Sequence, residues 1–168
     1  VESYHRSYGL PAAVARPFNA YGPRQSARAV IPTIMTQAFQ GDCIRLGALD
    51  PVRDLTFVED TVRGFIAVAR TDDAVGEVIN LGSGKGISIG DLAALILAVM
   101  GKPHLPLVSE EERKRPDTSE VYQLVCSNEK ARELCGWKPA VGLEEGVVRT
   151  AEWLEKHLHR MKGHIYNL

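Results

Sequence analysis

The sequence predicts an α/β fold, on the basis of its length, its buried strands and its helices. Its 168 residues, 45% of them hydrophobic, are enough for one domain with its own core. The short apolar runs at 12–16 and 77–81 are typical of strands buried on both faces. Longer segments with helical spacing of apolar residues, at 61–70 and 89–100, alternate with such strands. This alternation favours an α/β architecture.

Residues that break regular structure set the bounds of the elements. A helix over 1–8 ends at Gly9 and Pro11, and a helix over 29–40 tolerates Pro32 in its first turn. The remaining elements are strands at 44–46, 55–58 and 105–108, helices at 128–135 and 143–159, and loops at 47–53 and 110–120.

The helix over 89–100 carries a recognisable start and end. Ser88 followed by Asp91 resembles a capping box, in which the hydroxyl satisfies free N–H groups of the first turn. The carboxylate is also favoured there by the helix dipole. Gly101 ends the helix.

Composition excludes several classes of partner. A net charge of −1 with interspersed signs provides no basic patch for nucleic acid or anionic lipid. The longest apolar run, 92–100, is far shorter than the roughly 20 residues that span a bilayer. The cysteines and the histidines near the C-terminus have no spacing that favours a disulfide framework or a metal site. We therefore expect a soluble, cytoplasmic protein with no metal, nucleic-acid or membrane partner.

Polar residues follow the strand at 12–16 directly. Asn19 and Arg24 are expected in a loop at the carboxyl end of that strand, where open α/β sheets bind ligands. The alternative is a turn rich in Pro and Gly, in which the Asn side chain caps its own backbone.

Two further segments carry charges suited to a phosphate ligand. Arg53 beside Asp54 suits a guanidinium that is held by a carboxylate and presented to a diphosphate. The loop at 113–120 combines three cations with Glu120, a mixture able to bind phosphate and ribose hydroxyls. A surface ion pair and a solvated charge run are the respective alternatives.

The segment 82–86, G-S-G-K-G, looks like a phosphate cradle. It matches neither the dinucleotide-binding nor the P-loop spacing, and the next helix starts some residues later. We interpret it as a turn between a strand and a helix.

Seven motifs in a fixed order carry a family resemblance. They are R-P-F-N-A-Y-G-P-R-Q at 16–25, A-R-A-V-I-P-T-I at 27–34, I-R-L-G at 44–47, V-R-D-L-T-F-V-E-D-T at 52–61, I-N-L-G-S-G at 79–84, R-P-D-T-S-E-V at 115–121 and G-W-K-P at 136–139. Together they resemble the extended short-chain dehydrogenase/reductase family of NAD-dependent nucleotide-sugar epimerases and dehydratases. The chain is most similar to the 4,6-dehydratases of UDP-N-acetylglucosamine-type substrates.

The resemblance implies roles for residues of the first two motifs. Pro17 would lie beside the nicotinamide of the cofactor, with Phe18 near it and the sugar. Asn19 would hydrogen-bond the sugar or phosphate of the substrate, and Ala29 and Val30 would offer backbone groups near the nucleotide.

The later motifs are implied to bind the nucleotide. The segment Ile44 to Leu46 would line the base pocket. Arg53 would bind the diphosphate, Arg115 would add a second cation, and Glu120 would bind the ribose hydroxyls.

The family's catalytic motifs do not occur in this sequence. No Tyr has a Lys four positions on, and no G-x-x-G-x-x-G turn is present. The resemblance therefore implies the C-terminal, substrate-binding part of an extended Rossmann-type fold, with the last strands of a parallel sheet, no Gly-rich cofactor turn and no catalytic residue. By the same resemblance, residues 1–168 would form one nucleotide-sugar-binding domain, in which the regions near 1–17 and 58–100 would belong to the Rossmann core of a longer parent.

Several expectations follow for the partners of the chain. The parent would bind NAD and a nucleotide-diphospho-sugar, but the chain alone would not hold NAD tightly or catalyse the reaction. The alternatives are a 4-epimerase or decarboxylase of the same family, and a non-catalytic nucleotide-sugar-binding module. An exposed sheet edge is expected to favour a homodimer or self-association.

Overall fold

The structure is a computed structural model that describes residues 1–114, 116, 118 and 120–160. Helices and strands alternate along the chain, so the predicted α/β class is confirmed. The helices are α1 (Glu2–Tyr8), α2 (Val30–Gln40), α3 (Val58–Ala69), α4 (Ile89–Val99), α5 (Glu129–Cys135) and α6 (Leu143–Lys156). The strands are β1 (Val14–Pro17), β2 (Asn19–Tyr21), β3 (Ile44–Leu46), β4 (Val52–Phe57), β5 (Val78–Leu81), β6 (Gly86–Ser88), β7 (Leu107–Ser109) and β8 (Gln123–Leu124).

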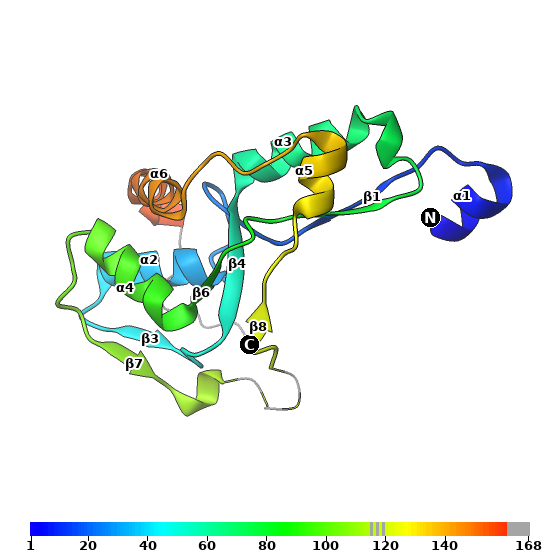
Figure 1. Cartoon of the computed structure of the whole chain (residues 1–168). Helices are drawn as coiled ribbons and strands as arrows, with labels where there is room; N and C mark the ends of the chain where they lie inside the picture. The colour runs from blue at the N-terminus through cyan, green and yellow to red at the C-terminus, as the bar shows by residue number, and fades with distance from the viewer. Residues whose placement is uncertain (115, 117, 119, 161–168) are drawn as a thin grey trace.

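The two strongest predicted strands, β1 and β5, pair with each other in parallel. Val14 lies opposite Val78, and Pro17 lies opposite Leu81. In Figure 1 this ribbon runs toward α1, with α3 and α5 packed beside it. A small core joins these elements, and its buried members are Val68, Ala74, Ile79, Leu81, Ala131 and Trp137.

Strand β4 is the centre of a second sheet. It pairs in parallel with β2 and β8 and antiparallel with β6. Three features differ from the sequence prediction. Asn19 lies in a strand and not in a loop, and β4 begins at Val52 and not at Leu55. Helix α3 begins at Val58, three residues before the predicted start at Thr61. The short strands β2, β6 and β8 all pair with β4. No local apolar pattern in the sequence predicts this pairing.

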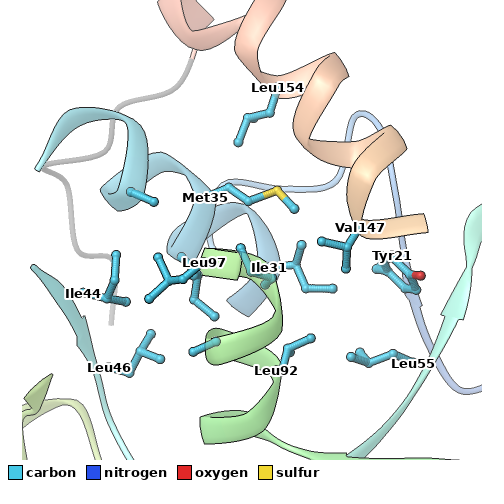
Figure 2. Close-up of a cluster of buried hydrophobic side chains, with 14 of the residues drawn as sticks. Tyr21, Ile31, Met35, Ile44, Leu46, Leu55, Leu92, Leu97, Val147 and Leu154 are labelled. Atoms are coloured by element: carbon cyan, nitrogen blue, oxygen red, sulfur yellow. The ribbon is translucent and has the colours of Figure 1, made fainter. Parts of the chain in front are cut away.

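The main core lies between β4 and three helices, α2, α4 and α6 (Figure 2). The parallel pair of β3 and β7 closes its other side. The largest fully buried side chains of this core are Tyr21, Ile31, Ile34, Met35, Ile44, Phe57, Leu92, Ile96, Val147 and Leu154. At about 25 cal/mol per Å² of apolar surface, such burial is the main source of stability.

Helix ends follow the predicted chemistry. Ser88 caps α4, because its Oγ accepts the N–H of Asp91 at 3.0 Å. The same hydroxyl donates to the Asp91 carboxylate at 2.6 Å, so the predicted capping box is present in a modified form. Pro32 lies in the first turn of α2, as predicted, and short 3₁₀ turns cover Asp72–Ala74, Glu111–Arg113 and Leu158–Arg160.

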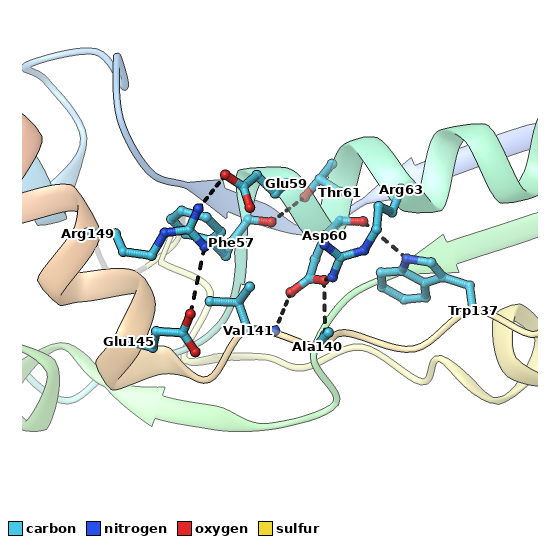
Figure 3. Close-up of polar contacts among 10 residues, drawn as sticks. All are labelled: Phe57, Glu59, Asp60, Thr61, Arg63, Trp137, Ala140, Val141, Glu145 and Arg149. Carbon is cyan, nitrogen blue, oxygen red and sulfur yellow. Dashed lines mark hydrogen bonds and ion pairs between the residues drawn. The ribbon is translucent and has the colours of Figure 1, made fainter.

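Asp60 connects the start of α3 to the G-W-K-P motif. Its fully buried carboxylate accepts the backbone N–H groups of Ala140 at 3.0 Å and Val141 at 2.9 Å and pairs with Arg63 (Figure 3). The indole N–H of Trp137 donates to the backbone carbonyl of Asp60 at 3.1 Å. The motif is therefore a structural anchor that holds the segment before α6 against α3.

Candidate functional site

A cavity of about 430 Å³ opens between the N-terminal end of α2, strand β3 and the start of β4. Its walls come from segments far apart in the sequence. The residues that line it are Asn19, Gln25, Arg28, Ala29, Val30, Ile31, Thr33, Arg45, Leu46, Gly47, Ala48, Pro51, Arg53, Leu55, Ile89, Arg113 and Glu120. Four arginines and one carboxylate among them give the lining an excess of positive charge, which favours an anionic ligand.

Arg53 and Glu120 form an ion pair on the β4 wall of the cavity. The Nη2 of Arg53 lies 2.8 Å from Oε1 of Glu120, and both side chains are largely buried. The other guanidinium nitrogen, Nη1, donates to the carbonyls of Val52 at 3.0 Å and Val121 at 2.6 Å. These contacts fix the plane of the guanidinium group. Its orientation toward the cavity is therefore determined before a ligand binds.

The carboxylate that holds Arg53 is Glu120, and not Asp54 as the sequence suggested. Successive residues of a strand point to opposite faces of the sheet, so Asp54 is turned away from the cavity and is fully buried. Its carboxylate accepts the backbone N–H groups of Ser83 at 2.8 Å, Gly84 at 2.8 Å and Cys126 at 3.0 Å.

Backbone N–H groups of the turn over 82–86 are therefore already occupied by a carboxylate of the protein. The sequence predicted a turn here and no phosphate site; in the structure the N–H groups of Ser83 and Gly84 donate to an anion inside the protein, the carboxylate of Asp54. Burial, and then the charge of Asp54, raise the pKa of the neighbouring Cys126 thiol to about 11.

The N-terminus of α2 forms a second wall of the cavity. Its N-cap is Ala29, which makes no side-chain cap hydrogen bond, and its first turn carries no acidic residue. Ala29, Val30 and Ile31 line the cavity directly. An uncapped helix N-terminus carries partial positive charge and free N–H groups, and therefore favours a phosphate.

Most of the predicted substrate residues converge on this cavity, namely Asn19, Ala29, Val30, Leu46, Arg53 and Glu120. The amide nitrogen of Asn19 donates to the carbonyl of Asp54 at 2.9 Å, which fixes its side chain at the cavity edge. Leu46 is 6% exposed and forms part of the apolar floor.

The other predicted residues lie elsewhere. Ile44 is fully buried in the main core and does not line the cavity. Pro17 ends β1 and Phe18 follows it, and neither lines the cavity; the N–H of Phe18 donates to the carbonyl of Leu81 at 2.9 Å. Arg115 lies outside the described residues.

The sequence analysis predicted that Ile44 to Leu46 and the loop at 113–120 take part in binding, but it did not predict that Arg45 and Arg113 flank Glu110 on the β3 side of the cavity. Arg45 lies 2.9 Å from Glu110, and Arg113 pairs with the same carboxylate. Hydrogen bonds from both guanidinium groups lower the pKa of Glu110. The only local signal was the alternation of Ile44, Arg45 and Leu46, which places a cation on the opposite face from two core residues.

Within the described part of the chain, no cluster of potential ligand side chains could hold a metal ion. None of the helices there has the length and apolarity required to cross a membrane.

Comparison with known proteins gives a consistent result. The family model described as GDP-mannose 4,6 dehydratase matches residues 1–150. A dTDP-glucose 4,6-dehydratase of Streptomyces griseus is 37% identical over 92% of this chain and 46% of its own length. A UDP-glucuronate 4-epimerase of Thermodesulfobacterium geofontis is 30% identical over 96% of this chain and 48% of its own length. The chain thus spans about half the length of these relatives.

Solved structures agree with the sequence comparisons. The dTDP-glucose 4,6-dehydratase of Bacillus anthracis, in complex with NAD, matches 96% of this chain and 50% of its own with a TM-score of 0.83 and 27% identity. The UDP-glucose 4-epimerase of Thermotoga maritima, with UDP-glucose, matches 94% of this chain and 50% of its own with a TM-score of 0.81 and 31% identity. Related structures therefore bind NAD and nucleotide sugars.

Proposed function

The chain belongs to the family of NAD-dependent nucleotide-sugar epimerases and dehydratases, and we propose that it is the C-terminal, substrate-binding portion of a 4,6-dehydratase. The proposed substrate is a UDP-linked sugar of the N-acetylglucosamine type. The observation that carries the proposal is the ion pair of Arg53 with Glu120, which faces the uncapped N-terminus of α2 across one cavity.

In this proposal each wall of the cavity binds one part of the ligand. Arg53 and the N–H groups at the start of α2 hold the diphosphate. Glu120 accepts hydrogen bonds from the ribose hydroxyls, and Leu46 contacts the base. Asn19 lies at the end of the cavity that binds the sugar. These roles agree with the chemistry of the lining, because the cations and helix N-terminus suit phosphates and the carboxylate suits hydroxyl groups.

The family reaction would oxidise C4 of the sugar, eliminate water across C5 and C6, and return the hydride to C6. NAD would supply the hydride acceptor and donor in the whole enzyme. Within the described residues, backbone N–H groups of the glycine-rich turn at 82–86 already bind the carboxylate of Asp54. The role proposed for this chain is therefore to bind and orient the substrate, with Pro17 and Phe18 nearest the cofactor.

A 4-epimerase or decarboxylase remains the alternative within the family, because an epimerase is also 30% identical to the chain. Related UDP-glucuronic acid decarboxylases are similar over nearly the whole chain as well. The residues implied to choose between these reactions accompany the catalytic Tyr and Lys, and this chain carries no Tyr-x-x-x-Lys pair. A non-catalytic nucleotide-sugar-binding module would use the same cavity without NAD.

Calorimetric titration of the chain with UDP and dTDP tests the proposal. We expect saturable binding of one nucleotide per chain, with UDP preferred, and a loss of about tenfold or more in the Arg53→Gln variant. Arg70→Gln, at the exposed end of α3 and outside the cavity, is the matched control and should bind normally. Absence of binding by the unaltered, folded chain would contradict the proposal.

A further inference from the structure

We propose that Arg28 determines the specificity of the cavity for nucleoside diphosphates over monophosphates. Its guanidinium is assigned to the phosphate that is distal to the ribose. The inference rests on the proposed function, and it adds a residue to which neither the family motifs nor the sequence prediction gave a role.

The first observation is the charge balance of the cavity. Arg45 and Arg113 share the carboxylate of Glu110, and Arg53 is paired with Glu120. Arg28 also lines the cavity, yet no carboxylate of the described residues lies within ion-pair distance of it. It therefore brings a positive charge that the described protein leaves uncompensated.

The second observation is the position of Arg28 in the fold. It directly precedes Ala29, the N-cap of α2, and its own N–H lies 3.3 Å from the hydroxyl oxygen of Ser26. Thr33 donates from its hydroxyl to the carbonyl of Ala27 at 3.1 Å, which ties this loop to the first turn of the helix. The backbone that carries Arg28 is thus held next to the first turn of α2, and Arg28 lines the cavity there.

A cation at a helix N-terminus opposes the helix dipole. Acidic residues are favoured at that end, and α2 has none in its first turn. Arg28 and the helix dipole therefore add their positive potentials at one point without an internal counter-ion. This arrangement is unfavourable in the free protein and becomes favourable when an anion binds between them.

The order of the ligand along the cavity selects the distal phosphate. Glu120, proposed to bind the ribose, lies 2.8 Å from Arg53, so Arg53 serves the phosphate next to the ribose. Arg28 belongs to the α2 wall, on a different element from Arg53. In this assignment the second phosphate extends from the β4 wall toward α2, where Arg28 and the N-terminus of the helix both line the cavity.

The test compares the affinities of UMP and UDP for the chain at one ionic strength. We expect Arg28→Gln to weaken UDP binding about tenfold while UMP binding changes less than about twofold. Arg28→Lys should retain part of the preference, because it keeps the charge and loses the planar fork. Arg70→Gln is again the control, since Arg70 is exposed at the end of α3 and does not line the cavity.

Thermal unfolding of the same variants separates binding from structure. Arg28→Gln should leave the melting temperature unchanged or raise it slightly, because it removes a cation from a helix N-terminus. Equal weakening of UMP and UDP, or no weakening of either, would overturn the assignment to Arg28. Failure of the unaltered chain to bind either nucleotide would instead overturn the proposed function.

Discussion

At the scale of single residues, Asp60 holds together segments that are 80 residues apart. Its carboxylate has no solvent exposure and accepts two backbone N–H groups, besides pairing with Arg63. A buried carboxylate of this kind is stable only because its donors replace water. Removing the charge would leave those donors without an adequate acceptor.

We predict that Asp60→Asn lowers the free energy of unfolding by about 2–3 kcal/mol. Urea denaturation followed by circular dichroism measures the change. Asp73→Asn, an exposed residue with no such contacts, should change the free energy by less than about 0.5 kcal/mol. Similar small changes in both variants would show that Asp60 has no anchoring role.

Cys126 offers a second test at the residue scale. Burial, followed by the charge of Asp54, raises its pKa to about 11, so at pH 8 the side chain is a protonated and poorly nucleophilic thiol. The half-buried Cys43 and Cys135 have better access to solvent.

In native protein at pH 8, we therefore expect alkylation of Cys43 and Cys135 before Cys126. Mass spectrometry of the peptides after timed treatment with iodoacetamide gives the order. In denaturant all of the cysteines should react at similar rates. If Cys126 of the native protein were labelled as fast as Cys43, the burial of Cys126 beside Asp54 would be contradicted.

At the scale of elements, two helical glycines differ in the space around them. A Cβ at Gly146 in α6 would overlap the hydroxyl of Tyr21 and lie 2.9 Å from Cδ2 of Phe57. A Cβ at Gly90 in α4 would lie 3.6 Å from its nearest neighbour, Leu49, which is ordinary contact. Helix propensity favours Ala at both positions, so packing alone distinguishes them.

We predict opposite effects of the same substitution at these two positions. Gly90→Ala should stabilise the protein by about 0.5–1 kcal/mol through helix propensity. Gly146→Ala should destabilise it by about 1–3 kcal/mol, because the close approach of α6 to Tyr21 would be lost. Thermal unfolding of both variants measures the difference. Stabilisation by both substitutions would mean that α6 does not pack as described.

The long helices and the strands β1 and β5 could be predicted from the sequence, because each carries a clear apolar pattern or a cap. The start of β4 could not be predicted, because Arg53 and Asp54 interrupt its apolar run and their polar side chains favour a loop. Their partners, Glu120 and Ser83, lie 67 and 29 residues away, beyond the reach of any local pattern.

At the scale of the whole molecule, the cavity could be predicted only in part. The order of the motifs indicated Asn19, Ala29, Arg53 and Glu120 as members of one site, and the fold brings them to one cavity. Arg28 could not be predicted, because its exposure and the absence of a carboxylate partner among the described residues are properties of the folded chain.

Helix α3, which does not line the cavity, carries an apolar stripe on its exposed face. Val62, Phe65 and Ile66 are 50%, 43% and 45% exposed and follow helical spacing, although the opposite face of α3 is already buried. Among the described residues, β1 and β5 pair only with each other, which leaves outer edges of this parallel pair uncovered (Figure 1). Such surfaces promote association.

We predict that the isolated chain self-associates through this region. Sedimentation should show an average mass that rises with protein concentration, and Ile66→Lys should reduce that rise without lowering the melting temperature. Glu155→Lys, an exposed change on α6, should leave the association unaltered. A monodisperse monomer with cooperative unfolding would contradict this prediction.

The most direct test of the central claim, that the cavity between α2 and β4 binds a nucleoside diphosphate, is a nitrogen-15 NMR titration with UDP. The account predicts saturable shifts of the backbone amides of Val30, Ile31, Leu46 and Arg53, with little change in the turn at 82–86. Shifts centred on the polar cavity between β5 and α5, or no saturable shifts in the folded chain, would contradict it.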